Sequence, residues 1–366
     1  MVAIFCRVGH SDLGLGDSLV AARTADPERA AMRNASTLAL RGRLIRLAGS
    51  GTIATLILLL VALWLVFAIT IGDRFFSVNT LQSMAFQMPE LGILSLAMML
   101  ALLSGGLNLS IIATANLSGL TIAFLLTHYI PGTQGIAWAG VQVLAIAAGF
   151  AVAALVGLVN GFVIAYLGVS PILATLGTMT LCKGLAIGLT RGNVISGFPE
   201  PIVFIGNGTV LGVPFALIVL ALCALPVALM LNATPFGARI YMIGSNEKAT
   251  RYSGVDTRAV LLKLYVLSSL LAGVAAVVML ARFNSANAAY GESYLLVTIL
   301  AAVLGGVDPF GGFGKVGGLL LALIILQVIS SAFNLLNLSQ FLTLAIWGGI
   351  LIAVAAVPHL GGKAPR

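Results

Sequence analysis

The chain has 366 residues, of which 60% are hydrophobic and only 8% are charged. Its mean hydropathy of +1.11 excludes an ordinary soluble domain. The formal net charge of +8 does not indicate nucleic-acid binding, because the Lys and Arg residues fall in short gaps between apolar blocks, where they orient a membrane protein. Cys6, Cys182 and Cys223 are too few and too scattered for a disulfide framework or a metal site, and we interpret them as structural.

The fold class follows from a long uncharged stretch, because residues 91–182 contain no Asp, Glu, Lys or Arg. One helical crossing of a bilayer needs about 20 apolar residues, so this stretch must cross several times. Its apolar segments are continuous and do not alternate at period two, which favours helices over a barrel. We therefore expect an all-α polytopic membrane protein with about ten transmembrane helices, with eight or nine as alternatives.

The two ends of the chain differ from its body. Residues 1–46 hold seven arginines and little apolar periodicity, and they predict a poorly ordered cytoplasmic tail. Residues 47–360 form the predicted membrane domain, and residues 361–366 form a short cytoplasmic tail.

Ten spans are expected in chain order, at residues 47–72, 81–103, 109–128, 136–167, 171–190, 211–231, 264–281, 293–307, 316–336 and 340–357. The fifth span begins after Ser170 because proline at position 171 suits the first turn of a helix. Residues 191–210 are dense in Gly, Pro and Asn and predict an external loop. Residues 234–263 are polar and basic and predict the largest internal loop, where a soluble partner would dock. An even number of spans places both termini on the cytoplasmic side.

A glycine-rich polar break, LSGGLNLS at residues 103–110, interrupts the apolar sequence. Paired glycines loosen a helix, and a broken helix exposes backbone groups that can line a cavity. The residues expected to line a substrate pathway are Gly105, Gly106, Asn108, Ser110, Thr114, Asn116 and Asn160. The alternative is that the glycines allow close helix packing and that the polar side chains bond neighbouring helices.

A second glycine-rich break lies at residues 304–318 and suggests comparable discontinuities in the two halves of the chain. We expect four glycines of this break to serve gating or packing: Gly305, Gly306, Gly311 and Gly312. Spacing by four predicts a helix-packing ridge at Gly149, Ala153, Gly157 and Gly161. For Gln142, Gln327, Asn334 and Asn337, contact with a neighbouring helix is favoured over contact with substrate.

Ionisable residues are nearly missing from the apolar blocks, whereas ion-driven carriers place such groups inside the membrane. Glu90, Lys183, Arg282 and Glu292 are expected near span ends, with their side chains reaching the interface. The energy for transport should therefore come from a source other than a coupled ion. The fragment GGFGKV lacks the spacing and the Ser or Thr of a phosphate-binding loop, so we expect no ATP site, no catalytic residue and no metal in this chain. An ion-coupled secondary carrier and a membrane scaffold are the alternatives from other classes.

Four segments in order carry a resemblance to a known family: LGILSLAMMLALLSGGLNLS, VSPILATLGTMTLCKGLAIGLTRG, TPFGARIYMIGSNEKATRYSGVDTRAVLLKLYVLSSLLAGVAAV and ILAAVLGGVDPFGGFGKVGG. Over residues 47–360 the chain resembles the permease subunit of bacterial ABC importers of the ribose, xylose and galactose type. The resemblance implies a fold like that of type II ABC importers, in the inner membrane. It also implies a second permease chain, an ABC ATPase that holds ATP and Mg²⁺, and a periplasmic sugar-binding protein.

The resemblance also implies roles for particular residues. In that family the TPFG segment begins the cytoplasmic region that engages the ATPase, which assigns coupling to Gly237, Gly244, Asn246, Ala249 and Gly254. The chain departs from the family at Asn108, where an aspartate is usual, and at Lys315, where a small polar residue is usual. The expected solute is a monosaccharide or a sugar alcohol. Branched-chain amino acids are the alternative, because their permeases share the broad pattern.

Overall fold

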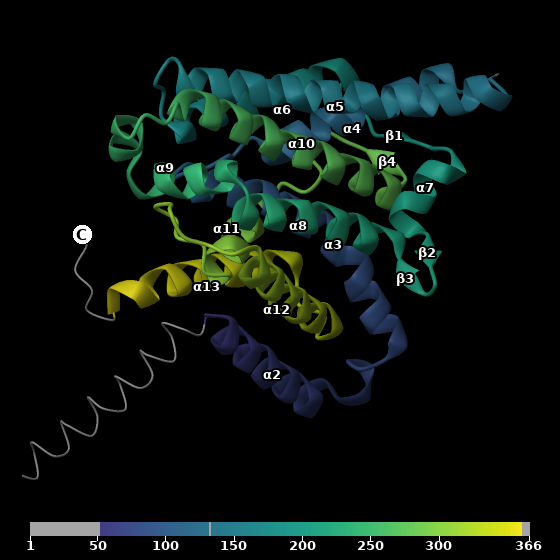
Figure 1. Cartoon of the computed structure of the whole chain (residues 1–366). Coiled ribbons are helices and arrows are strands. Elements are labelled where there is room, and N and C mark those ends of the chain that lie inside the picture. The colour runs from purple at the N-terminus through teal and green to yellow at the C-terminus, as the bar shows by residue number, and fades with distance from the viewer. Residues whose placement is uncertain (1–51, 132, 361–366) are drawn as a thin grey trace, which may run out of the picture. The chain divides into compact units, whose positions relative to one another are not determined.

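The computed structural model describes residues 52–131 and 133–360 (Figure 1). The expectations for the tails, residues 1–46 and 361–366, lie outside the described residues. The apolar helices are α2 (Thr52–Ile71), α3 (Val78–Leu103), α4 (Ile111–Tyr129), α5 (Gly135–Ala165), α6 (Pro171–Thr190), α8 (Phe215–Ala233), α10 (Thr257–Phe283), α11 (Tyr294–Leu304), α12 (Val316–Leu335) and α13 (Gln340–Leu360). The remaining elements are η1 (Gly72–Arg74), α7 (Glu200–Asn207), α9 (Pro235–Tyr252), β1 (Ile195–Ser196), β2 (Thr209–Val210), β3 (Val213–Pro214) and β4 (Ser285–Ala286).

The all-α polytopic fold is confirmed. Among the described residues, 8 helices are long and apolar enough to cross a membrane, and two shorter apolar helices cover Tyr294–Leu304 and Phe341–Val354. Together these elements correspond to the ten expected spans. The fifth of them begins at Pro171 and ends at Thr190 as predicted, and the Ser170 hydroxyl accepts a hydrogen bond from the Leu173 amide.

Two segments are more ordered than the sequence predicts. The polar segment 234–263 is not a loop, because it contains α9 and then the start of α10 at Thr257, seven residues before the predicted span start at residue 264. Asp256 caps α10 by accepting a hydrogen bond from the Ala259 amide at 3.2 Å. The predicted external loop 191–210 contains α7, and β1 within it pairs antiparallel with β4.

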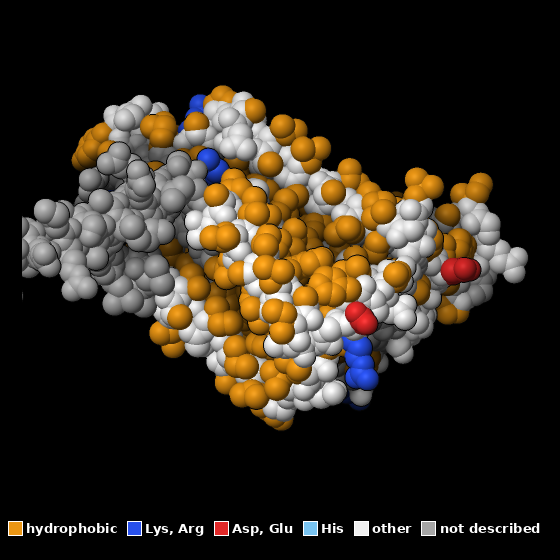
Figure 2. Space-filling model, turned by 90° about the horizontal axis from the view of Figure 1, so that it is seen from below, with side chains coloured by type: hydrophobic (Ala, Val, Ile, Leu, Met, Phe, Trp, Pro, Cys, Tyr) orange, Lys and Arg blue, Asp and Glu red, His pale blue; other side chains and the backbone are white. Residues whose placement is uncertain are grey.

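Helices α3 and α10 form the centre of the described unit. Within each, 78% of the most apolar window is buried, whereas the corresponding value for α2 is 6%. Residues 91–103 of α3 are all buried, so every face of this half of the helix contacts protein. Figure 2 shows a face covered mainly by apolar side chains with few charges, as expected of a surface that contacts lipid.

The predicted small-residue ridge on α5 is confirmed as a packing surface. A Cβ added at Gly157 would lie 2.7 Å from the Val266 Cα, and one at Gly161 would lie 2.9 Å from the Leu262 Cα. Helices α5 and α10 therefore approach more closely than any larger side chain at these positions would allow.

Candidate functional site

The polar side chains around the first break form a closed hydrogen-bond network. Asn108 Nδ2 donates to Ser268 Oγ at 2.9 Å, and Ser110 Oγ donates to Asn108 Oδ1 at 2.8 Å. Asn160 Nδ2 donates to Ser110 Oγ at 2.8 Å, and Thr178 Oγ1 donates to Asn160 Oδ1 at 2.6 Å. The network thus joins the break to α5, α6 and α10.

This network is inaccessible in the conformation described. Asn108, Ser110, Asn160 and Ser268 all have 0% exposure. Ser268 Oγ in turn donates to the Ala97 carbonyl at 2.8 Å, which fixes the break against α3. The hydrogen bonds agree with the packing alternative for these residues, and their role in a substrate pathway stays a prediction.

Two further predicted pathway residues lie elsewhere on α4. Thr114 has 0% exposure. Asn116 Nδ2 donates to the carbonyls of Ala288 and Tyr290 at 3.0 and 2.9 Å, which ties α4 to the segment before α11. Asn116 also lines a cavity of about 190 Å³ together with Lys183 and Glu292, whose charged groups lie 2.7 Å apart.

Glycines from three separate segments meet at one point, which we call the glycine junction: Gly105, Gly244, Gly311 and Gly312. The Gly312 amide donates to the Leu103 carbonyl at 3.0 Å, which joins the two breaks directly. A Cβ added at Gly311 would lie 2.6 Å from the Gly105 amide nitrogen and 2.9 Å from the Gly244 Cα. The positions predicted separately for pathway, coupling and gating are thus neighbours.

Helix α9 is attached to this junction by backbone contact and by one hydroxyl. A Cβ at Gly244 would overlap the Leu103 carbonyl oxygen and the Gly312 nitrogen. Tyr241 Oη donates to the Gly314 carbonyl at 2.8 Å. Partial burial raises the pKa of Tyr241, so the hydroxyl stays protonated as a donor. Helix α9 therefore contacts both breaks.

The other predicted coupling residues shape α9 and its ends. Asn246 has non-helical backbone angles, and its side chain accepts a hydrogen bond from the Ala249 amide at 2.9 Å, so α9 consists of two short helices joined at a kink. Gly237 packs against the last turn of α8, where a Cβ would overlap Leu231. Gly254 has a φ of +83° in the turn before α10, a conformation that favours glycine.

Gly305 and Gly306 end α11. A Cβ at Gly305 would lie 2.7 Å from the Leu319 Cα, so the end of α11 packs tightly on the start of α12. Gly306 has a φ of +83° and turns the chain away from the helix. Lys315, one of the two departures from the family pattern, is exposed at the N-terminus of α12.

A cavity of about 370 Å³ lies between α3, α11, α12 and α13, and we call it the amide cavity. The residues that line it carry amide, hydroxyl, aromatic and aliphatic groups and no charge: Gln87, Leu91, Ser293, Tyr294, Val297, Leu326, Gln327, Ser330, Asn334, Leu338, Thr343, Leu344 and Trp347. Sequence reasoning named only Gln327 and Asn334 among these residues. The other polar lining residues could have been found as isolated polar residues within an apolar span, as Gln87 is.

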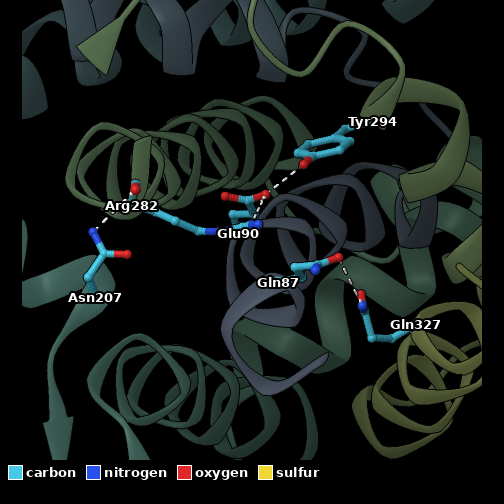
Figure 3. A network of polar contacts seen from close by, with 6 residues as sticks. All are labelled: Gln87, Glu90, Asn207, Arg282, Tyr294 and Gln327. Atoms are coloured by element: carbon cyan, nitrogen blue, oxygen red, sulfur yellow. Dashed lines mark hydrogen bonds and ion pairs between the residues drawn. The ribbon is translucent and has the colours of Figure 1, made fainter. Parts of the chain in front are cut away.

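A buried ion pair borders the amide cavity (Figure 3). Glu90 is 1% exposed, and its Oε1 accepts hydrogen bonds from Arg282 Nη1 at 2.5 Å and from Tyr294 Oη at 2.6 Å. Gln327 Nε2, from the lining of the amide cavity, donates a hydrogen bond to Gln87 Oε1 at 3.3 Å. The expectation that Glu90 reaches the membrane interface is therefore wrong, because its carboxylate is neutralised inside the protein.

These features define a class: a polytopic α-helical membrane protein with two broken helices, a cavity lined by polar and apolar side chains, and a polar helix packed on both breaks. The model of the family described as branched-chain amino acid transport system / permease component matches residues 79–355. The chain therefore belongs to this family of transport permeases.

Curated relatives agree with this membership. The chain is 36% identical over 267 residues to the ribose import permease protein RbsC of Bacillus subtilis, which covers 72% of this chain and 80% of the relative. It is 30% identical over 289 residues to the autoinducer 2 import system permease protein LsrD of Yersinia enterocolitica, covering 77% and 84%. The corresponding protein of Photorhabdus temperata is 30% identical over 303 residues, covering 81% and 88%. No solved structure matches the chain.

Proposed function

We propose that this chain is the permease subunit of an ATP-driven importer for a neutral monosaccharide or sugar alcohol. The observation that carries the proposal is the amide cavity, whose polar lining consists of three amides and three Ser or Thr hydroxyls beside Tyr294 and Trp347. Amides and hydroxyls both donate and accept hydrogen bonds, as sugar hydroxyls require, and aromatic faces suit the apolar faces of a sugar ring. Similarity to the ribose and autoinducer 2 import permeases supports the same assignment.

Branched-chain amino acids fit this cavity less well. A zwitterion taken out of water needs charged partners or exposed helix ends for its two charges. No charged side chain lines the amide cavity among the described residues, and Glu90 beside it is not a lining residue and is bonded through Oε1 to Arg282 and Tyr294. The family description nevertheless keeps an amino acid as the rival solute.

The source of energy in this proposal is an ABC ATPase that docks on α9. The kinked helix exposes Arg239, Lys248 and Arg251, a basic surface that would complement an acidic groove. ATP and Mg²⁺ would bind to that partner, and this chain would perform no chemistry. The α9 side and both termini would then face the cytoplasm of a bacterial inner membrane, and a periplasmic binding protein would deliver solute to the opposite side.

A second permease chain would cover the open face of α6. Lys183 and Glu292 are about half exposed, with side-chain exposures of 43% and 52%, although Lys183 lies within a spanning helix. Charges so placed are costly against lipid, which favours contact with water or protein on this face. Gly177, Gly184 and Gly188 on α6 have no atom within 4 Å of an added Cβ, so another helix could approach here.

The solute assignment is tested with the partners of the chain. Co-purification with the tagged chain from native membranes would identify the ATPase and the binding protein, and a ligand screen on that binding protein would follow. We expect a pentose, a hexose or a sugar alcohol. Tight, selective binding of leucine would overturn the carbohydrate assignment. Uptake that collapses with an uncoupler at constant ATP would instead indicate an ion-coupled carrier.

The cavity is tested by transport in proteoliposomes that contain the assembled importer. The double variant Gln327→Leu, Asn334→Leu should lower ATP-dependent sugar uptake about tenfold or more, because lost hydrogen bonds leave sugar hydroxyls unpaired. Gln142→Leu is the matched control, since Gln142 is 7% exposed within α5 and does not line the cavity. Equal uptake by the double variant and the control would exclude the amide cavity from the pathway.

A further inference from the structure

A second large cavity, of about 400 Å³, lies beside α9 and apart from the amide cavity; we call it the α9 cavity. Its wall comes from four parts of the chain: the first break, the connection between α5 and α6, α9, and the first turns of α10. Its volume is within the range of about 300–1,000 Å³ that is usual for small-molecule sites. A ligand in this cavity would touch α9 and the membrane helices at the same time.

The most buried residue that lines the α9 cavity carries an unpaired hydroxyl, and we call its side the deep end. Tyr265 on α10 lines the cavity and has 0% exposure, and its Oη has no hydrogen-bond partner among the described residues. A Cβ added at Gly106 would lie 2.5 Å from this oxygen, so Gly106 leaves the space that the hydroxyl occupies. A buried hydroxyl without a partner is costly, which points to a polar group that completes the site.

The outer end of the cavity is cationic. Arg251 from α9 and Arg258 from α10 both line it, against the single acid Glu247, which leaves a formal charge of +1. The Arg258 guanidinium lies 5.8 Å from the centre of the Tyr166 ring, which holds it at the rim. The N-terminus of α6, at Pro171, also lines the cavity and adds a favourable dipole for an anion.

The two ends are separated by a distance that fits one small molecule. Arg258 and Tyr265 are seven residues apart on α10, which corresponds to about 10 Å along a helix. An anionic group at the arginines and a hydroxyl group at Tyr265 could therefore belong to the same ligand. A lysine or a carboxylate at the deep end would have indicated a second charged group on the ligand. Tyr265 requires only a hydrogen-bond partner.

We propose that the α9 cavity binds a phosphate-bearing polyhydroxylated ligand, with the phosphate at Arg251 and Arg258 and a hydroxyl group at Tyr265. Two sources share this chemistry: a free sugar phosphate, and the glycerol phosphate headgroup of an anionic lipid. Because the ligand bridges α9 to α10 and to the α5–α6 connection, its binding holds α9 in the position described here. The regulatory consequence, that a bound ligand restrains coupling during import, rests on the proposed function; the binding itself does not.

The test uses the full chain in nanodiscs and measures binding by calorimetry without any transport step. In phosphatidylcholine nanodiscs, ribose 5-phosphate should bind more tightly than inorganic phosphate, and ribose alone should not bind at this site. Tyr265→Phe should weaken ribose 5-phosphate about tenfold and leave inorganic phosphate unchanged, because only the hydroxyl contact is lost. The double variant Arg251→Ala, Arg258→Ala should lose both ligands. Phosphatidylglycerol in the nanodisc distinguishes the sources: competition with ribose 5-phosphate assigns the site to lipid.

The control is Arg239→Ala, which removes an exposed arginine from α9 that does not line the cavity. This variant should bind ribose 5-phosphate as the unchanged protein does, and thermal unfolding verifies that all variants are folded. Equal binding by the double arginine variant and the unchanged protein would overturn the proposal. So would the failure of the sugar phosphate, phosphate and phosphatidylglycerol alike to bind. Either failure leaves the proposed transport function standing, since sugar uptake is measured separately.

Discussion

Arg282 Nη1 lies 2.5 Å from Glu90 Oε1, although the two residues are 192 positions apart in the chain (Figure 3). The pair joins α3 to α10, and Tyr294 extends it to the start of α11. An unpaired charge inside a membrane protein is costly, so each partner depends on the other. The ion pair thus fixes three helices around one wall of the amide cavity.

Glu90→Leu should destabilise the protein strongly, by about 3–5 kcal/mol, because it leaves the arginine without its partner. The double variant Glu90→Leu, Arg282→Leu should regain much of that loss, because no charge is then left unpaired. Thermal unfolding of the purified protein in detergent measures both effects. A double variant that is no more stable than Glu90→Leu alone would contradict this interpretation. Glu292→Leu is the control, and it should cost less because its partner Lys183 is half exposed.

Gly244→Ala should disturb the glycine junction, because the added Cβ would overlap the Leu103 carbonyl oxygen and the Gly312 nitrogen. Overpacking of this kind costs about 1–3 kcal/mol, and we expect α9 to separate from the breaks. In the assembled importer the variant should insert into the membrane but lower the stimulation of ATP hydrolysis by solute. Gly140→Ala in α5 is the matched control, because an added Cβ there has no atom within 4 Å. Equal ATPase stimulation in the two variants would rule out coupling through the junction.

Substitutions of Gly254 test whether this position needs glycine for its backbone conformation or for contact with a partner. Its φ is +83°, and a Cβ there would have no atom within 4 Å. Gly254→Asn should therefore be milder than Gly254→Val, because asparagine tolerates a positive φ and a β-branched residue does not. Measurement of uptake and of thermal stability tests this order. Equal damage from both substitutions would indicate that a partner contacts this position directly.

Asn108→Asp, which restores the residue usual in the family, should destabilise this chain. Asn108 Nδ2 donates to Ser268 Oγ, whose hydrogen already goes to the Ala97 carbonyl, so a carboxylate would face an oxygen without a donor. We expect a loss of about 1–3 kcal/mol or more, measured by thermal unfolding. The same substitution at the exposed Asn337, in the turn after α12, is the control and should change little. A stability equal to that of the unchanged protein would show that the network can rearrange around an aspartate.

The membrane fold could be predicted because lipid constrains each span by itself. Every segment must be apolar along its length and must satisfy its own backbone, so the uncharged stretch 91–182 and the restart at Pro171 are visible without knowledge of neighbours. The glycine ridge of α5 is equally local, because its spacing of four defines one helix face.

Relations between segments could not be predicted in this way. From the sequence, Glu90 and Arg282 are each expected at the membrane interface. Only the packing of α3 on α10 makes them a buried pair. Gly105, Gly244 and Gly312 belong to three distant segments, and their sequences do not reveal that they meet. The amide cavity likewise takes residues from four helices, one or a few from each.

By itself, the sequence determined that this chain lies in a bilayer, roughly where its apolar spans lie, and which segments break the pattern, because these properties depend on local hydrophobicity and backbone chemistry. Only the tertiary structure decided that the Asn108 network is closed while the amide cavity and the α9 cavity are open. The physical reason is that a polar side chain in a span needs a partner, and three-dimensional packing alone decides whether that partner is another helix or a ligand.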